Sequence, residues 1–525
     1  MKTYYLLSLV LCLIYLLIKS KKAIHMLQQN WYNEDDRYIN WIFNNKKKVF
    51  LIFDIIFIVF LFLKSKVLII SFVIYYLLAF YINNKKEKNE QVKKPLVFTP
   101  RVKRLYVTLT VFYIIVIYLT TILWYNELHL SFYCFYVSLI IYLNYLFVYL
   151  CNVINKPIEK MIFNHFKRMA KNKLESMTNL KKVAITGSYG KTSTKNFLND
   201  ILNVKYNSYA TERSFNTMNG LMISINNKLD KFTDIFIAEM GASSLGEIKE
   251  KTKFIKPDYA IITTIGSAHL ESFGSRENIQ KAKFELVDYM SENGVAVLNM
   301  DDVYQREYKS KNNCKKIWVS MNNKRADVYA SDIKSSSRGT SFKCHFNKES
   351  VLLETKILGS ANIYNILESV ALAHELGLTL EQIQMGVKRI KPIEHRLELK
   401  KLGEITIIDD AYNSNPVGSM MAIDVLGMMD GKKIIVTPGM IELADKQYEY
   451  NNEFGKNIAK VCDEVILIGE EQTKPIYDGL ISEKFDKEKI HILNDVKKAF
   501  PLMRKLSDKN TYVLLENDLP DMFNE

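Results

Sequence analysis

The stretch Ile185–Phe197, which reads ITGSYGKTSTKNF, has residue types that could bind a nucleotide phosphate. A glycine-rich turn between a strand and a helix lets backbone N–H groups and the helix N-terminus hold phosphate oxygens. In such a turn Lys191 would reach the β- and γ-phosphates, and the Thr192 hydroxyl would bind Mg²⁺. The general nucleotide-loop pattern has its first glycine five positions before Gly190, whereas the first glycine here is Gly187.

The elements that must position this loop are legible from residue 181 onward. Short β-branched runs alternate with stretches of helical apolar spacing such as Arg276–Met290 and Ala361–Leu376. This alternation predicts an α/β fold with mostly parallel sheets and helices on both faces. The predicted strands are KKVAIT just before the loop, then DIFIAEM, YAIITTI, GVAVLNM, ITIIDD, KKIIVT and EVILIG.

The shifted glycine resembles the T-G-x-x-G-K-T-[ST] loop of the Mur ligase family, which builds the peptide of bacterial cell-wall precursors. Further segments match the family in order over about residues 180–450, and they are most similar to its D-alanyl-D-alanine-adding branch. These segments are SFNTMNG (214–220), AEMGASSLGEI (238–248), AHLESFGSRENIQKAKFEL (268–286), LNMDD (298–302), GSANIYNILESVALA (359–373) and IIDDAYNSNPVGSM (407–420).

The resemblance implies both a domain organisation and a reaction. Residues 180–390 would form a central P-loop ATPase domain, and residues 391–525 a C-terminal Rossmann-like α/β domain. ATP would phosphorylate a substrate carboxylate, and an amine would attack the acyl phosphate to give an amide. Two Mg²⁺ ions would neutralise the transferring phosphoryl group. The segment Arg389–Arg396 would be the hinge that closes the site.

The resemblance also implies the site residues. The metal ligands would be Thr192, Glu239, His269 and Lys283, the last as a carbamate that supplies an oxygen ligand instead of a repelling ammonium. The catalytic residues would be Lys191, His269, Lys283 and Arg396. The contacts to ATP and the acyl phosphate would be Gly187, Ser188, Gly190, Lys191, Thr192, Ser193, Asn299, Arg396, Asp410, Asn413 and Asn415. A structural histidine at 269, a solvated helix lysine at 283 and a strand-end carboxylate at 239 are the alternatives.

The chain departs from the family at both ends. The usual N-terminal domain that grips the uridine-diphosphate sugar is absent, and apolar spans occupy its place. The late K-G-S-R-type loop is also absent, and LLENDLPDMF (514–523) stands near its expected position. The ATP half is kept while the substrate-recognition ends differ, which favours a different substrate.

The basic excess lies in the same N-terminal third as the apolar spans. Residues 1–175 hold 24 of the 71 Lys and Arg but only 9 of the 57 Asp and Glu, which leaves the remainder nearly neutral. Basic clusters beside apolar spans are typical of membrane proteins, so nucleic acid is not needed to explain them. The six cysteines include no C-x-x-C pair, which favours a reducing compartment over a disulfide framework or zinc site.

Residues 1–155 are predicted to form an α-helical membrane domain of four or five spans. The basic loops predict an outside N-terminus and cytoplasmic residues after Cys151. Asp54 would lie within a span, as a functional carboxylate or near the interface. Residues 156–179 would form a linker, with Lys156–Lys173 either an amphipathic helix on an anionic membrane face or a solvated helix. The predicted spans are Tyr4–Ile18, Val49–Leu63, Val67–Ile82, Leu105–Trp124 and Leu130–Cys151.

The leading functional interpretation is a bacterial, membrane-bound, ATP-dependent amide-forming ligase. It would join an amino acid or dipeptide to a carboxylate-bearing envelope precursor, which could be carried on a lipid. One alternative is a wall-precursor ligase acting on the soluble nucleotide sugar, with the helices as an anchor. A second is a membrane scaffold that binds ATP without catalysis.

Overall fold

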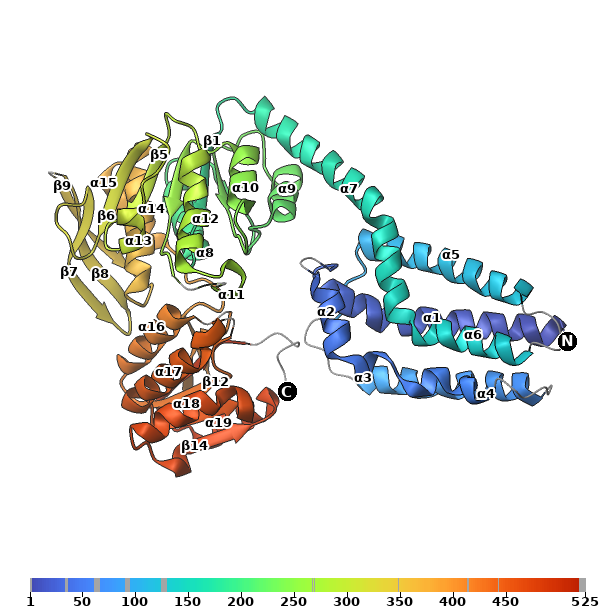
Figure 1. Cartoon of the computed structure of the whole chain (residues 1–525). Coiled ribbons are helices and arrows are strands. Elements are labelled where there is room, and N and C mark those ends of the chain that lie inside the picture. Colours follow the sequence, from blue (N-terminus) through green and yellow to red (C-terminus); the bar gives the residue numbers. More distant parts are fainter. Residues whose placement is uncertain are drawn as a thin grey trace. The chain divides into compact units, whose positions relative to one another are not determined.

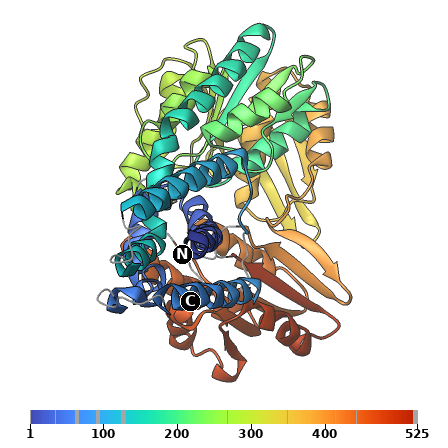
Figure 2. The same ribbon diagram turned by 90° about the vertical axis from the view of Figure 1, so that its right-hand side faces the viewer.

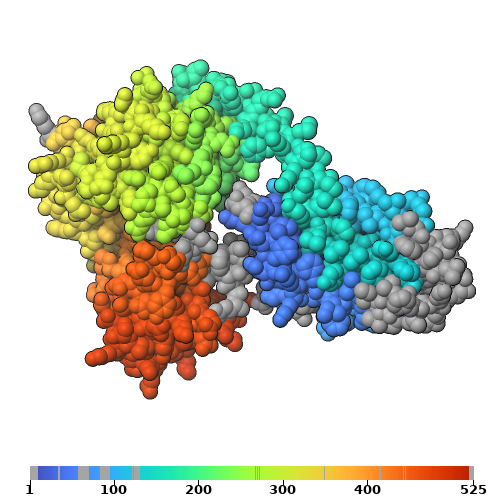
Figure 3. All heavy atoms as spheres, viewed as in Figure 1, coloured from blue at the N-terminus to red at the C-terminus, as the bar shows by residue number. Residues whose placement is uncertain are grey.

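The chain folds into two compact units, Met1–His165 and Phe166–Glu525 (Figures 1 and 3). The computed structural model describes residues 2–33, 36–60, 67–89, 95–123, 130–266, 268, 270–347, 349–412, 415–441 and 443–518. His269 and Asn413, two of the predicted site residues, lie outside these ranges. The domain boundaries predicted from the sequence stay predictions.

The first unit is helical, and its apolar side chains form one core. The helix α1 packs against α4 and α5, which lie on either side of it in Figure 2. Large buried side chains such as Tyr38, Phe72, Tyr113 and Tyr133 fill the space between the helices. The elements are α1 (Lys2–Gln29), α2 (Arg37–Asn44), α3 (Lys46–Val49), the 3₁₀ helix η2 (Ile52–Phe60), α4 (Val67–Asn89), α5 (Pro100–Leu123), α6 (Leu130–Tyr142) and α7 (Asn144–Ser176), which continues into the second unit.

Fewer membrane-length helices are found in the described residues than the four or five predicted spans. Among the described residues, Pro100–Thr120 in α5 is the one helix long and apolar enough to cross a bilayer, with a second only if α6 and α7, bent by 67°, are one span. The span predicted at Val49–Leu63 is a 3₁₀ helix as far as Phe60, and residues 61–66 lie outside the description. The membrane location of this unit therefore stays a prediction.

The second unit contains a nine-stranded sheet in the order β2-β3-β1-β4-β5-β6-β7-β8-β9. It is parallel from β2 to β7, and β7–β9 extend it as antiparallel hairpins. The strands are β1 (Lys181–Thr186), β2 (Ser208–Ala210), β3 (Ile235–Glu239), β4 (Tyr259–Ile262), β5 (Val295–Asn299), β6 (Lys315–Ser320), β7 (Val328–Ser336), β8 (Gly339–Phe346) and β9 (Glu349–Thr355).

Helices cover this sheet and carry several of the predicted motifs. They include α8 (Lys191–Leu202), α9 (Met218–Asn227), α10 (Glu247–Ile255), α11 (Leu270–Phe273), α12 (Arg276–Tyr289), α13 (Val303–Glu307), α14 (Ala361–Glu375) and α15 (Leu380–Arg389). The predicted strand-and-helix alternation is confirmed here. The antiparallel extension β7–β9 was not predicted, since half of β7 is exposed and lacks a continuous apolar run.

A six-stranded sheet follows in the order β10-β11-β15-β12-β13-β14, and only β10 runs antiparallel to its neighbour. Its strands are β10 (Glu398–Leu402), β11 (Ile405–Asp410), β12 (Lys432–Thr437), β13 (Glu464–Ile468), β14 (Ile490–Leu493) and β15 (Thr511–Glu516). Its helices are α16 (Pro416–Gly427), α17 (Gln447–Val461), α18 (Glu470–Ser482) and α19 (Val496–Leu506). This arrangement confirms the predicted C-terminal α/β fold.

Candidate functional site

The glycine-rich loop connects the end of β1 to the start of α8. Gly187 and Gly190 both have positive φ angles, of 154° and 81°. A Cβ atom on Gly187 would lie 1.9 Å from the Thr263 hydroxyl oxygen, and one on Gly190 would lie 2.4 Å from the Asn365 amide oxygen. Both positions therefore require glycine, because neither the backbone conformation nor the space admits a side chain.

Lys191, the first residue of α8, folds its side chain back over this loop. Its Nζ donates hydrogen bonds to the carbonyl oxygens of Gly187 at 2.9 Å and Ser188 at 3.0 Å. Burial lowers the pKa of Lys191 to about 8; the positive charge of Arg396 adds to this effect, and Glu239 opposes it. Three predicted site residues are therefore neighbours in the fold, since Lys191 is within electrostatic reach of both Glu239 and Arg396.

Arg396 reaches the loop from the segment after α15. Its Nη2 donates a hydrogen bond of 3.4 Å to the hydroxyl of Thr192, and its guanidinium lies 4.6 Å from the centre of the Tyr412 ring. Thr192 itself is buried, 7% exposed. One arginine therefore joins the glycine-rich loop to the C-terminal sheet.

Glu239 ends β3, next to β1, and is 1% exposed. Its Oε1 accepts a hydrogen bond of 3.1 Å from the Asn216 amide, and its Oε2 lies 3.1 Å from Nζ of Lys195. Lys195 is fully buried and also donates to the carbonyl oxygen of Arg213. Lys195 was not predicted from the sequence, although its spacing of four residues from Lys191 puts both lysines on one face of α8.

Lys283 is 2% exposed and lies on the buried face of α12, whereas Lys281 is exposed. The alternative of a solvated helix lysine is therefore wrong. Burial lowers the pKa of Lys283 to about 7, and the positive charges of Lys191 and Lys251 add to that effect. Its ammonium lies 5.6 Å from the centre of the Phe273 ring. A neutral amine is the form that adds carbon dioxide, so this environment is compatible with a carbamate.

Three residues from the ends of strands have different roles. Asp410, at the end of β11, accepts a hydrogen bond of 3.1 Å from the Leu397 amide, and burial raises its pKa to about 6. Asn415 caps α16, accepting 2.9 Å from the Gly418 amide. The side-chain oxygen of Asn299 accepts a hydrogen bond of 2.9 Å from the backbone amide of Asp301, within the same turn.

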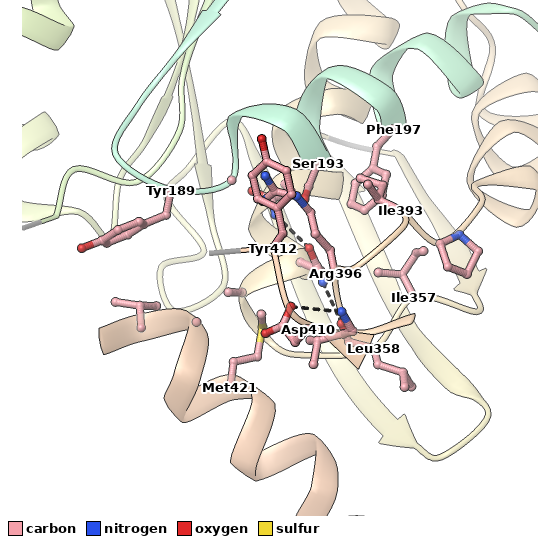
Figure 4. A pocket seen from close by; sticks show the side chains of 18 of the residues that line it. Tyr189, Ser193, Phe197, Ile357, Leu358, Ile393, Arg396, Asp410, Tyr412 and Met421 are labelled. Atoms are coloured by element: carbon pink, nitrogen blue, oxygen red, sulfur yellow. Dashed lines mark hydrogen bonds between the residues drawn. The ribbon is translucent and has the colours of Figure 1, made fainter. Parts of the chain in front are cut away.

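A cavity of about 300 Å³ lies between the glycine-rich loop and the C-terminal sheet (Figure 4). Five predicted site residues line it: Gly190, Ser193, Arg396, Asp410 and Asn415. Tyr189, Phe197 and Tyr412 also line it and add aromatic surface. Asn299 does not line this cavity.

Of the four predicted metal ligands, the structure describes Thr192, Glu239 and Lys283, and His269 lies outside the described ranges. Within the described ranges, no group of three or more His, Cys, Asp and Glu side chains could hold a metal ion. The Thr192 hydroxyl and the Glu239 carboxylate are oxygen donors of the kind that Mg²⁺ prefers. Neither the two metal ions nor the carbamate is tested by the structure.

One motif residue that had no predicted role has a structural one. Glu285, from the matched segment AKFEL, accepts hydrogen bonds from the amides of Gly246 at 2.7 Å and Lys249 at 2.9 Å. A carboxylate at the N-terminus of a helix satisfies free N–H groups and the helix dipole. Glu285 therefore fixes the start of α10, which follows the loop after Glu239.

Two family models match this second unit. The Mur ligase middle domain matches residues 185–373, and the Mur ligase glutamate ligase domain matches residues 395–516. The chain therefore belongs to the Mur ligase family. Neither match includes the N-terminal helical unit.

Curated relatives and solved structures give the same result. The chain is 32% identical over 298 residues to the UDP-N-acetylmuramoyl-tripeptide–D-alanyl-D-alanine ligase of Buchnera aphidicola subsp. Baizongia pistaciae, covering 56% of this chain and 65% of the relative. With the enzyme of that name from Bacillus subtilis it shares 29% over 339 residues, covering 64% and 72%. The chain thus spans about two thirds of the length of these relatives.

Among solved structures, MurF from Acinetobacter baumannii aligns with a TM-score of 0.62 and 26% identity, over 68% of this chain and 77% of that one. MurF ligase from Thermotoga maritima in complex with ADP aligns with a TM-score of 0.61 and 27% identity, over 68% and 80%. The second unit therefore has a MurF-like fold.

Proposed function

We propose that the chain is an ATP-dependent ligase that joins a carboxylate to an amine through an acyl phosphate. The observation that carries this proposal is that Lys191 and Arg396 contact the glycine-rich loop and the start of α8, while Glu239 ends the neighbouring strand β3. Ligands of parallel α/β sheets bind outside the carboxyl ends of the strands, where these residues lie. Two cations can hold a polyphosphate there, while the carboxylate can bind a divalent ion.

The proposed reaction has two steps. A carboxylate oxygen of the first substrate attacks the γ-phosphorus of ATP, and the bond to the β-phosphate oxygen breaks and releases ADP. The amine of the second substrate then attacks the acyl carbon, phosphate leaves, and the nitrogen loses a proton. Lys191 and Arg396 would stabilise the negative charge that develops during transfer.

The metal would be held at the same place. Thr192 and Glu239 would be its ligands, and Mg²⁺ bound there would neutralise charge on the phosphoryl oxygens. Asn216 and Lys195 fix the orientation of the Glu239 carboxylate through contacts of 3.1 Å. His269 and the carbamate of Lys283 remain further proposed ligands.

The substrates are proposed from the relatives. These are named for UDP-N-acetylmuramoyl-tripeptide and D-alanyl-D-alanine. We expect the chain to add a dipeptide of this class to a cell-wall precursor, because no comparison supports the lipid-linked acceptor that the sequence first favoured. A lipid-linked acceptor is the second candidate, because the N-terminal unit lies outside the matched family segments. The same assay tests it.

The test is a product screen with the full chain in detergent. ATP, Mg²⁺ and D-alanyl-D-alanine are supplied with either the UDP-linked tripeptide or a lipid-linked precursor, and products are read by mass spectrometry. The proposal expects an amide product and equal release of ADP with the UDP-linked substrate. Product only from the lipid-linked precursor would favour the second candidate. ATP binding without product from either acceptor would favour the non-catalytic scaffold.

A further inference from the structure

The N-terminal unit exposes large apolar side chains on its outer faces and buries several polar side chains within its apolar core. In α5, every side chain beyond Lys103 that is described and exposed is apolar. Their spacing of three and four residues puts them on one face of the helix. These side chains are Val107, Val111, Ile114, Ile115, Tyr118, Leu119 and Ile122. They cover about 22 Å of helix at about 1.5 Å per residue, which is most of a hydrocarbon core of about 30 Å.

The same outward exposure occurs on other elements of this unit. Large apolar side chains are exposed on α1 (Val10, Ile14), η2 (Ile52, Phe53), α4 (Ile70, Ile74, Leu77, Leu78, Tyr81, Ile82) and α7 (Leu150, Ile154). Figure 3 shows residues of α5 and α7 at the surface of the unit. Apolar exposure this extensive is unusual for a monomer in water. Because it occurs on so many elements, one face of a partner copy could not cover it.

Within its apolar core the unit also buries one ion pair and several hydrogen-bonding groups. Lys19 forms an ion pair with Asp54, and both are buried. The Lys19 ammonium also donates 3.2 Å to the carbonyl oxygen of Ile141, close to the break between α6 and α7. Ionisable side chains in a bilayer pair with each other or with backbone carbonyls in the bundle interior. This ion pair follows that arrangement.

Uncharged polar groups in the interior are paired in the same manner. The side-chain amide of Asn144 donates hydrogen bonds of 3.0 Å to the hydroxyl of Ser20 and 3.3 Å to the hydroxyl of Tyr113. These two bonds join α7 to α1 and α5. Tyr76 of α4 donates 3.0 Å to the hydroxyl of Ser138 in α6. These hydrogen bonds join the helices to one another through side chains of the interior.

Basic residues gather where α1 ends and α5 begins. Two hydrogen bonds of 3.0 Å between Gln28 and Val97 place these ends together. Arg101 lies 3.7 Å from the centre of the Tyr32 ring at the same end. Exposed lysines of the adjoining elements are Lys22, Lys46, Lys47, Lys48 and Lys103. Anionic lipid headgroups attract such clusters.

We infer that the outer faces of α4, α5 and η2 contact the acyl chains of a lipid bilayer, and that this basic end meets anionic headgroups. This inference does not depend on the proposed ligase activity. The proposed partner of this apolar surface is lipid. The competing possibility is that a second copy of the chain covers the same side chains.

The experiment uses the full chain with Ile115→Cys, labelled with a thiol-reactive fluorophore; the six native cysteines are all buried. The chain is reconstituted into phosphatidylcholine–phosphatidylglycerol vesicles with brominated acyl chains. The control is Phe232→Cys in the second unit, at a residue 70% exposed. We expect brominated lipid to quench the label at 115 but not at 232, and aqueous iodide to do the reverse.

Two results would overturn the inference. Iodide quenching at 115 in vesicles would show that this face contacts water. Protection from both quenchers, with disulfide cross-links between copies or without them, would show that protein covers it. For the basic end, the combined variant Lys46→Gln, Lys47→Gln and Lys48→Gln should lower the preference for phosphatidylglycerol vesicles at least about fivefold. An unchanged preference would overturn the headgroup assignment.

Discussion

The hydroxyl of Tyr412 donates a hydrogen bond of 2.6 Å to the hydroxyl oxygen of Ser214. Tyr412 follows β11 in the C-terminal α/β domain, and Ser214 lies in the asparagine-rich segment after α8. The ring of Tyr412 also covers Arg396, which bonds to Thr192. Tyr412 thus connects the two α/β domains by a hydrogen bond, and its ring packs against Arg396, which reaches the glycine-rich loop.

Tyr412→Phe should raise the KM for ATP about fivefold, because one hydrogen bond worth about 1 kcal/mol is lost. Ser214→Ala should have the same effect, and the double variant should be no worse than either single one. Steady-state kinetics with varied ATP would test this. Tyr412→Leu should in addition lower kcat, since the stacking on Arg396 contributes about 0.5–1 kcal/mol. Additive effects of the two single variants would contradict a shared hydrogen bond.

Lys191→Ala should lower kcat at least about 100-fold, because one preorganised contact to charge in a transition state is typically worth about 3–4 kcal/mol. ADP release that depends on both substrates is the measurement. The control is Lys205→Ala, which should keep its activity. Lys205 lies just beyond the C-terminal end of α8 and donates a hydrogen bond to the Gly377 carbonyl oxygen. Unchanged turnover in Lys191→Ala would contradict the role of Lys191 in stabilising the transferring phosphoryl group.

Lys283→Met should abolish amide formation and leave the fold intact. Methionine is chosen because the side chain is buried, so alanine would leave a cavity that destabilises the protein. Removing a buried amine costs no stability, and thermal unfolding should occur at or above the normal temperature. Lys281→Met, exposed on the same helix, is the matched control. Acetate or formate should partly restore activity to Lys283→Ala by supplying an oxygen ligand. Equal activity of the variants at 281 and 283 would reject the carbamate.

Lys195→Met should lower the free energy of unfolding by about 3–5 kcal/mol, because it leaves the buried Glu239 carboxylate without its partner cation. The double variant Lys195→Met, Glu239→Gln should recover most of this loss, since no buried charge remains. Urea unfolding of all three variants gives the comparison. If Lys195→Met is as stable as the parent, the 3.1 Å contact between Lys195 and Glu239 does not contribute to the free energy of unfolding.

Asp410 should make stability depend on pH between about 4 and about 6. Its pKa is 3.8 when unfolded and is raised to about 6 in the fold, so the native state binds the proton more tightly. Stability is then highest below the unfolded pKa and falls as pH rises towards 6. At about 1.4 kcal/mol per unit, the fall is at most about 3 kcal/mol. Asp410→Asn should flatten this part of the pH profile, measured by urea unfolding; an identical slope would contradict the assignment.

Much of the second unit could be predicted from the sequence. The β-branched runs of β1, β3 and β5 are buried strands, and such runs are readable because both faces of a parallel sheet are covered. The hairpins β7–β9 were missed because alternating burial gives a weaker pattern. The 3₁₀ helix at Ile52–Phe60 was missed because its composition is that of an apolar helix, and tertiary packing decides the backbone.

The candidate site residues that were named from the sequence all lie in sequence motifs. Lys191, Glu239 and Arg396 come together although they are distant in the sequence. Lys195 and Tyr412 were missed, because their roles depend on contacts with Glu239 and Ser214 that only the folded chain brings about. The nucleotide contact predicted for Asn299 stays a prediction, and its side-chain oxygen accepts a hydrogen bond from the backbone amide of Asp301.

The two glycines of the loop have a further consequence for reading related sequences. Thr263 and Asn365 fill the spaces where side chains of Gly187 and Gly190 would be. Packing alone therefore preserves both glycines, even in a descendant that has lost catalysis. The loop pattern would then persist in pseudoenzymes as a folding requirement. Retention of Lys191, whose side chain hydrogen-bonds to two carbonyls of the loop instead of filling space that the glycines need, is the better marker for separating active members from inactive ones.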